Sequence, residues 1–282
     1  MRGAIIGDIV GSIYEFDNIK TKDFPLFGEG CFFTDDTVMT CAVAHAAQML
    51  DGMRDHGELD YDAFQDKCNK NYHLLGAEYP DRGYGSHFLD WIYDIDAPAY
   101  NSCGNGSAMR VSPVAWIARN EEECLELAKR TALPSHDHPD GIAGACATAL
   151  AVYLARMGRS KDDIRDAVSD YYDLSFTLDE IRPDYDWGAL CSDTVPQAVV
   201  AFLESTSFED AIRNAEAEKW RKSDPQKKQR SDGMAAQLEH LIEELDGDIA
   251  AAEASGDAKK LAELQDAKSA REAWLAQVTK DL

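Results

Sequence analysis

Apolar residues recur every three or four positions along most of the chain, which is the spacing of helices that bury one face. Runs of alternating β-branched residues, as expected for half-buried strands, are nearly absent. The pattern therefore predicts an all-α domain whose function is carried by the loops at the helix starts. Helices are expected at residues 37–50, 61–75, 85–93, 106–118, 121–132, 140–157, 160–172, 194–204 and 207–220.

A further helical stretch, GAIIGDIVGSIYEF, opens the chain and carries two acidic residues. Gly3, Gly7 and Gly11 are four apart, so they form a stripe along which another helix could approach closely. Asp8 interrupts an otherwise apolar segment, where an unpaired charge is costly, so we expect it to cap or pair with another group. Glu15 falls seven residues later on the same face; it could be a catalytic acid or base, or an ordinary solvated glutamate.

The composition changes near residue 216, where the apolar helices give way to the polar hinge RKSDPQKKQRSDG. Beyond the hinge, apolar residues return at helical spacing on either side of a break at SGD, and the pattern predicts an antiparallel helical hairpin with a narrow apolar seam. The seam residues are Leu238, Leu241, Leu245, Ile249, Leu261, Leu264, Trp274, Leu275 and Val278. We therefore expect two domains, 1–220 and 221–282.

The formal net charge of −24 limits the kinds of partner. From Glu216 onward there are 15 acidic and 11 basic residues, so −20 of the total belongs to the first domain. No basic patch is visible to neutralise phosphates, and we expect no nucleic-acid partner. A single anionic ligand would have to be held by local devices such as helix N-termini, backbone amides or a bound cation.

The seven cysteines are scattered, odd in number and never arranged as CxxC. This favours reduced thiols over a disulfide framework or a zinc site, and it fits a cytoplasmic protein. No secretory signal is expected because Asp8 breaks the first apolar run. The longest uncharged stretch, GIAGACATALAVYLA, is too short to span a bilayer, so no membrane partner is expected either.

The tetrapeptide TDDT places Asp35 and Asp36 directly after Thr34 and ahead of an apolar helix. Thr34 is a good N-cap, and the helix dipole favours anions in the first turn. The same hydroxyl and carboxylates could also face a hard divalent cation, which takes oxygen ligands. The two interpretations are compatible.

Three more helices are expected to begin with small, oxygen-rich loops. The loop CGNGS allows close approach of a ligand and offers free amides, or it is a plain turn capped by Asn105 or Ser107. His136 and His138 precede the next helix without a third zinc ligand nearby, so they line a pocket or cap the helix. Asp193 and Thr194 likewise place oxygen-bearing side chains at the start of a later helix. If these starts converge they form a crevice for an anion and a metal, but spacing alone does not show convergence.

Taken together, these stretches resemble the ADP-ribosylglycohydrolase family, of the dinitrogenase-reductase-activating glycohydrolase type. The similar segments occur in the family's order and cover roughly residues 1–215. They are GAIIGDIVGSIYEF, FTDDTVMT, YPDRGYG, NSCGNGSAMRVSPVAW, SHDHPDGIAGACATALAVYLAR, CSDTVPQAVVAFLES and SFEDAIRNA.

The resemblance implies an all-α orthogonal multi-helix bundle, here followed by the C-terminal hairpin, with one or two Mg²⁺ ions in a crevice. It implies a hydrolase that removes ADP-ribose from modified side chains or cleaves related conjugates, so ADP-ribose or an ADP-ribosylated protein would be its partner. It assigns catalysis to Glu15 and Asp35, metal binding to Thr34, Asp35 and Asp36, and ligand binding to Gly104, Asn105, Gly106, Ser107, His136 and His138.

One family motif has no match. The family carries a second metal-binding stretch, Gly-Gly-Asp-x-Asp-Thr, shortly after DAIRNA, whereas this chain continues EAEKWRKSDPQKKQRSDG and the motif does not occur later. Asp193 and Thr194 do not replace it, because their segment has its own earlier match. About half of the protein ligands of a two-metal site are therefore absent from this sequence, which weakens metal affinity and raises at least one carboxylate pKa.

Three hypotheses follow. The first is a working hydrolase with one metal ion, or with substitute ligands such as Asp224 or Asp232. The second is a catalytically weak or inactive protein that binds ADP-ribose. The third is a scaffold whose tail hairpin mediates self-association and carries the function.

Overall fold

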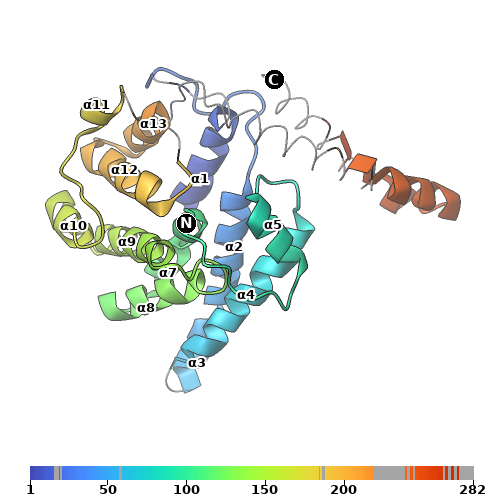
Figure 1. Cartoon of the computed structure of the whole chain (residues 1–282), viewed down its shortest axis with the longest axis horizontal. Coiled ribbons are helices and arrows are strands. Elements are labelled where there is room, and N and C mark those ends of the chain that lie inside the picture. Colours follow the sequence, from blue (N-terminus) through green and yellow to red (C-terminus); the bar gives the residue numbers. More distant parts are fainter. Residues whose placement is uncertain are drawn as a thin grey trace. The chain divides into compact units, whose positions relative to one another are not determined.

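A computed structural model describes most of the chain, and it is helical (Figure 1). The described residues are 1–15, 19, 21–56, 59–183, 185 and 188–218, with 239, 242–243, 245–262, 264–265, 268–269 and 272 in the tail. They contain no strand, only a single antiparallel bridge between Gly104 and Leu190. The helices cross one another at steep angles, and the predicted all-α class is confirmed.

The first unit consists of short and medium-length helices, which are given next in chain order. They are α1 (Arg2–Gly11), the 3₁₀ turn η1 (Ser12–Tyr14), α2 (Asp35–Ala47), α3 (Met49–His56), α4 (Tyr61–Glu78), α5 (Ser86–Tyr93), α6 (Gly106–Met109), α7 (Ser112–Ile117), α8 (Glu121–Ala132), α9 (Pro139–Arg156), α10 (Lys161–Val168), α11 (Leu178–Ile181), α12 (Cys191–Glu204) and α13 (Phe208–Glu218).

The predicted single helix at 106–118 is wrong, because it is divided into α6 and α7. Pro113 has no N–H group and could not donate to the carbonyl of Met109, as a continuous helix would require. The Met109 carbonyl instead accepts from the Thr40 hydroxyl at 3.3 Å, which fastens the break to α2. The four-residue helix α11 was not predicted; its capping box between Thr177 and Glu180 is the feature that marks it.

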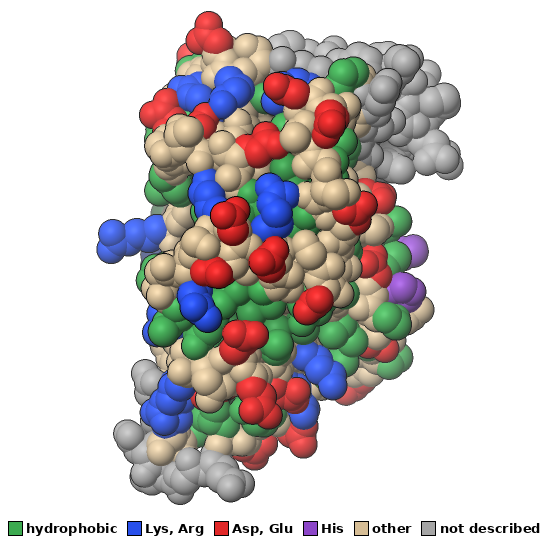
Figure 2. Space-filling view, turned by 90° about the vertical axis from the view of Figure 1, so that its left-hand side faces the viewer, with side chains coloured by type: hydrophobic (Ala, Val, Ile, Leu, Met, Phe, Trp, Pro, Cys, Tyr) green, Lys and Arg blue, Asp and Glu red, His purple; other side chains and the backbone are tan. Residues whose placement is uncertain are grey.

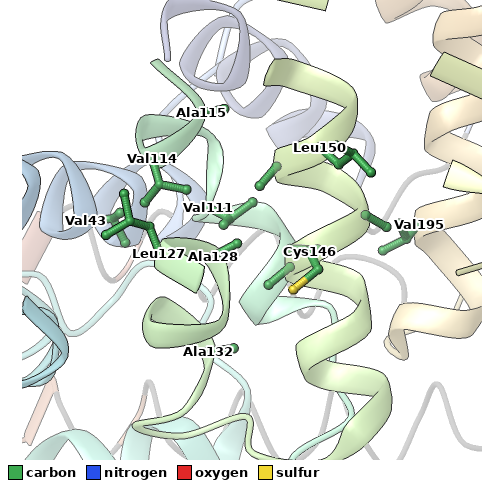
Figure 3. Close-up of a cluster of buried hydrophobic side chains, with 14 of the residues drawn as sticks. Val43, Val111, Val114, Ala115, Leu127, Ala128, Ala132, Cys146, Leu150 and Val195 are labelled. Carbon is green, nitrogen blue, oxygen red and sulfur yellow. The ribbon is translucent and has the colours of Figure 1, made fainter. Parts of the chain in front are cut away.

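Helix α9 lies at the centre of the first unit and contacts α6, α7, α8, α10 and α12. Its sequence is rich in glycine and alanine, so neighbouring helices approach closely. At Gly144 an added Cβ atom would lie 2.3 Å from the Cys191 Sγ atom of α12. Figure 3 shows the buried side chains between α9 and its neighbours, among them Val111, Leu127 and Leu150.

The predicted glycine stripe of α1 makes a close approach at Gly3 and none at Gly7. An added Cβ atom at Gly3 would lie 3.3 Å from the Phe208 ring of α13, whereas one at Gly7 would meet nothing within 4 Å. Helix α1 also packs against α2.

Contacts divide the chain into two units, Met1–Trp220 and Arg221–Leu282. Within the second unit the chain is helical from 245 to 255, turns at Gly256 with φ of +71°, and is helical again from 258. Lys268 Nζ reaches Asp246 Oδ1 at 2.5 Å, which joins the two arms as an antiparallel hairpin. Leu245 is buried, in agreement with the predicted seam, and Leu238, Leu241, Trp274, Leu275, Val278, Asp224 and Asp232 lie outside the described residues.

Acidic and basic side chains are interspersed on the face of the molecule seen in Figure 2. None of the helices in the described ranges has the length and apolar character needed to cross a membrane.

Candidate functional site

Helix α2 begins at the two adjacent aspartates. Thr34 has an extended backbone and its hydroxyl accepts from the Asp36 N–H, so Thr34 caps the helix as predicted. Asp35 and Asp36 occupy the first turn. The Asp35 N–H, one of the groups that a helix start leaves unpaired, donates to the carbonyl of Arg82 at 2.7 Å. The start of α2 is therefore fixed both by its own cap and by the loop at 81–85.

Half-buried Asp8 of α1 caps the same helix start, and these contacts are the pairing that the sequence predicted for it. Its Oδ2 atom accepts from the N–H groups of Thr34 at 2.9 Å and Thr37 at 3.2 Å. The hydroxyls of both threonines also donate to the Asp8 carboxylate. The proton of the Thr34 hydroxyl is directed at Asp8 and one lone pair accepts from the Asp36 N–H, so the second lone pair of that oxygen remains available to an electron-pair acceptor.

Four carboxylates gather at this point. Burial is the largest influence raising the pKa of Asp35 well above its ordinary value, followed by the negative charges of Asp36, Glu15 and Asp8. Glu15 lies at the end of η1, half-buried and close enough to act on Asp35. The fold therefore brings the sequence-predicted residues Glu15, Asp35 and Asp36 together, and their mutual repulsion would be relieved by a cation.

The donor set consists of the oxygen ligands that a hard divalent cation such as Mg²⁺ takes. Mg²⁺ retains several waters and is commonly bound through one or two carboxylates together with substrate phosphates. Thr34, Asp35 and Asp36 supply one hydroxyl and two carboxylates of this kind. No group of three or more His, Cys, Asp or Glu side chains in the described part of the chain forms a metal-binding cluster.

A row of aromatic side chains leads from the acidic residues to the glycine loop. Tyr84 is buried with no hydrogen-bond partner for its hydroxyl among the described residues, and its pKa is raised by burial and by the nearby charge of Asp35. The Tyr84 and Phe88 ring centroids are 5.8 Å apart, and those of Phe88 and His136 are 6.1 Å apart. His136 in turn lies against Gly106.

The glycine loop is held by the start of α12. Gly104 forms the β-bridge with Leu190, and the Asn105 N–H donates to the carbonyl of Ala189 at 2.8 Å. The Cys191 N–H donates back to the carbonyl of Cys103 at 3.0 Å. The starts of α6 and α12 are therefore side by side, although their sequences are more than 80 residues apart.

The start of α9 contacts the same loop. The starts of α6, α9 and α12 therefore lie together, which the spacing in the sequence did not show. A Cβ atom at Gly141 would lie 2.6 Å from the carbonyl oxygen of Ser102, so only glycine fits. The carboxylate of Asp140 accepts from the Ser192 N–H at 3.3 Å, which links α9 to α12. Asp193 and Thr194 lie in the first turn of α12, and the Thr194 hydroxyl donates to the carbonyl of Leu190.

Two of the predicted ligand-binding side chains have structural contacts of their own. The Ser107 hydroxyl is fully buried and donates to the Gly141 carbonyl at 2.6 Å, so it fastens α6 to α9. His138 is the N-cap of α9, where its Nδ1 atom accepts from the Asp140 N–H at 3.1 Å. Asn105 is the N-cap of α6 without a side-chain cap.

His136 is the predicted histidine that faces the glycine loop. It is 4% exposed, and an added Cβ atom at Gly106 would lie 2.8 Å from its Nε2 atom. Burial lowers the pKa of His136 well below its ordinary value, and the positive charge of Arg110 lowers it further. The imidazole is therefore neutral near pH 7.

The site also contains residues that sequence analysis did not assign. Arg110, Ser135, Tyr84 and Phe88 are buried side chains beside or beneath the predicted ligand residues. Arg110 and Tyr84 stand within segments already matched to the family, NSCGNGSAMRVSPVAW and YPDRGYG, which was the available indication. Their burial depends on contacts between distant segments.

Comparison with known proteins agrees with this architecture. A family model described as ADP-ribosylglycohydrolase matches residues 1–221. ADP-ribosylhydrolase ARH3 of Homo sapiens and of Bos taurus are each 30% identical over 196 residues, and that of Mus musculus is 29% identical. Each alignment covers 58% of this chain and 50% of the relative, so the chain matches about half the length of these relatives.

A solved structure titled ADP-ribosylglycohydrolase-related protein complex has the same fold, with a TM-score of 0.54 and 20% sequence identity. The similarity covers 77% of this chain and 78% of that one. The family model extends over most of the chain and includes the acidic residues, the glycine loop and the histidine loop. This chain therefore belongs to the ADP-ribosylglycohydrolase family.

Proposed function

We propose that the protein is a magnesium-dependent hydrolase that removes ADP-ribose from modified side chains or cleaves related ADP-ribosyl conjugates. The observation that carries the proposal is the row of buried rings from Asp35 through Tyr84 and Phe88 to His136, which connects the carboxylate cluster with the glycine loop. An ADP-ribosyl group has a ribose at one end and a diphosphate beside it. A ligand laid along this row would place the ribose near the carboxylates and the diphosphate near Gly104–Gly106.

Ribosyl bonds break through a transition state with positive charge on the sugar, which carboxylates stabilise. Glu15 would accept a proton from the attacking water or donate one to the leaving group. Asp35 would hold the ribose end in place, with its raised pKa moderated when a cation is bound. The Gly104–Gly106 loop would lie against the diphosphate, beside the His136 ring for which the missing Cβ atom of Gly106 makes room.

Thr34, Asp35 and Asp36 would hold the magnesium ion. When bound, the ion would polarise the ribose hydroxyls and neutralise part of the carboxylate charge. Asp8 supports this arrangement by accepting a hydrogen bond from the Thr34 hydroxyl, which leaves a lone pair of that oxygen for the ion.

The direct test is calorimetric titration of the whole chain with ADP-ribose, with and without Mg²⁺, followed by a release assay on ADP-ribosylated substrates. We expect binding that depends on Mg²⁺ and measurable release of ADP-ribose. Asp35→Ala should abolish the magnesium-dependent release, whereas Asp60→Ala, which removes a cap at α4 outside the site, should leave it intact. Release that is unchanged in Asp35→Ala would contradict the assignment.

A second function deserves the same test because the Gly-Gly-Asp-x-Asp-Thr stretch is missing from the sequence. A protein with half of the metal ligands could bind ADP-ribose or an ADP-ribosylated protein without turnover. Binding that is indifferent to Mg²⁺, together with no release of ADP-ribose, would favour this binding module over the hydrolase.

A further inference from the structure

Arg110 is a fully buried cation without a carboxylate partner among the described residues. It is 0% exposed, and its guanidinium lies 4.1 Å above the Tyr72 ring centroid. One nitrogen, Nη2, donates to the carbonyl of Thr131 and to the hydroxyl of Ser135, each at 2.9 Å. Because burying an unneutralised charge is costly, the position calls for a role beyond packing.

Ser135 connects this cation to the histidine of the site. Its Oγ atom lies 2.9 Å from Arg110 Nη2 and 2.8 Å from His136 Nδ1. A guanidinium can only donate, so the Ser135 oxygen is the acceptor in the first contact. The serine proton is then free to donate, and His136 Nδ1 is the acceptor in reach among the described residues.

The other ring nitrogen of His136 faces the glycine loop. Added Cβ atoms at Gly106 and Gly104 would lie 2.8 Å and 3.6 Å from Nε2. A neutral imidazole carries one proton, so if Nδ1 accepts, Nε2 must carry the proton. The donor then lies at the Gly104–Gly106 loop, where the absence of a Cβ atom at Gly106 makes room for the imidazole.

We propose that Arg110 and Ser135 are positioning residues that hold His136 as the neutral tautomer protonated at Nε2, so that it presents a hydrogen-bond donor at the Gly104–Gly106 loop. The acceptor would be an anionic or hydroxyl oxygen of the ligand. The identification of this oxygen as part of ADP-ribose rests on the proposed function. The assignment of the His136 tautomer does not rest on it. The arrangement excludes a role for His136 as a general base through Nε2, because that nitrogen has no free lone pair.

Nitrogen NMR of the ligand-free, uniformly ¹⁵N-labelled chain tests the proposal. The two ring nitrogens of each histidine are correlated through the ring protons, and His136→Gln identifies the His136 signals among the seven histidines. At pH 7.5 we expect Nδ1 at the resonance position of an unprotonated nitrogen and Nε2 at that of a protonated one. The reverse assignment, or equal averaged shifts for both, would overturn the proposal.

Ser135→Ala removes the connection, and we expect the two His136 nitrogen shifts to move toward a common average as both tautomers become populated. Ser112→Ala is the matched control, since Ser112 has a buried hydroxyl without a partner among the described residues, and it should leave both shifts in place. Unchanged shifts in folded Ser135→Ala would contradict the role of Ser135. If that variant does not fold, the wild-type spectrum still decides the tautomer.

The measurement needs no ligand, so it separates the two proposals. Absence of ADP-ribose binding in calorimetry would count against the proposed function and leave the tautomer result as it stands. Binding of ADP-ribose with His136 protonated at Nδ1 would overturn the positioning role and leave the proposed function as it stands.

Discussion

Asp8 and Thr34 are joined by two hydrogen bonds across 26 positions of sequence: the Thr34 N–H donates to Asp8 Oδ2 at 2.9 Å, and the Thr34 hydroxyl donates to Oδ1. A residue of α1 therefore completes the N-terminus of α2. The contact keeps Thr34 in position beside Asp35 and Asp36, so the acidic site depends on the packing of these two helices.

Asp8→Asn tests this dependence. One carboxylate oxygen would be replaced by an NH₂ group facing the N–H and hydroxyl donors of Thr34 or Thr37, so we expect a loss of about 1–3 kcal/mol in the free energy of unfolding. Urea denaturation measures it. Asp60→Asn is the control: Asp60 caps α4 through Ala63, and because asparagine caps nearly as well, about 0.5 kcal/mol or less should be lost. Equal losses in both variants would argue against a special role for Asp8.

Asp35→Asn should raise the thermal stability of the metal-free protein at neutral pH. The folded-state pKa of Asp35 is raised, so the folded protein holds this proton more tightly than the unfolded chain does. The resulting contribution to the free energy of unfolding is fully present below the unfolded pKa of about 3.8 and is lost as the pH rises through the folded-state pKa. The variant lacks this loss. We therefore expect a higher Tm than wild type at pH 7.5 in EDTA, and no advantage near pH 3.

Addition of Mg²⁺ provides the second arm of the same measurement. A cation that binds only the folded protein stabilises it, so Mg²⁺ should raise the Tm of wild type and not of Asp35→Asn. A wild-type Tm that is already higher than that of the variant in EDTA at pH 7.5 would contradict the repulsion inferred for the carboxylate cluster.

Two glycine substitutions within helices should have opposite effects. Gly144→Ala would place a methyl group 2.3 Å from Cys191 Sγ, and overpacking of this kind costs about 1–3 kcal/mol. Gly7→Ala meets nothing within 4 Å and should stabilise α1 by up to about 1 kcal/mol through reduced chain entropy. Chemical denaturation of the two variants compares them directly. A Gly144→Ala protein as stable as wild type would show that α12 can move away from α9 without cost.

The scaffold hypothesis, in which the tail hairpin mediates self-association, can be tested by deletion of the tail. If the hypothesis holds, light scattering coupled to size-exclusion chromatography should give a molar mass for the full chain that exceeds the mass of one copy. Deletion of residues 221–282 should leave a monomer that keeps its helical circular dichroism, since the first unit is defined without the tail. A full chain that is monomeric in this measurement would contradict self-association and therefore the scaffold hypothesis.

Local features of the fold were predictable because their causes lie within a few residues. The cap at Thr34, the acidic first turn of α2 and the extent of α8 can be recognised from residues adjacent in the sequence, although Asp8 and Arg82 also hold the start of α2. The break between α6 and α7 also has a local cause in Pro113, which the apolar periodicity concealed. Periodicity records burial, and both halves of that segment are buried.

The meeting of the glycine loop with α9 and α12 was not predictable from spacing. It depends on the Gly104–Leu190 bridge and on the close approach at Gly141, which join segments tens of residues apart. Arg110 shows the same limit more sharply. A long cationic side chain is usually solvated, and only the folded chain reveals that it lies beneath the site.

The position of α9 has a consequence for how the first unit opens. Five helices of the described part of the chain pack against it, and its small side chains bring them close. Amide protons near the middle of α9 can therefore reach solvent only when most of the unit comes apart, so their exchange reports global unfolding. The loops that begin α6, α9 and α12 lie at the edge of this helix, so we expect their amides to exchange through smaller, local openings.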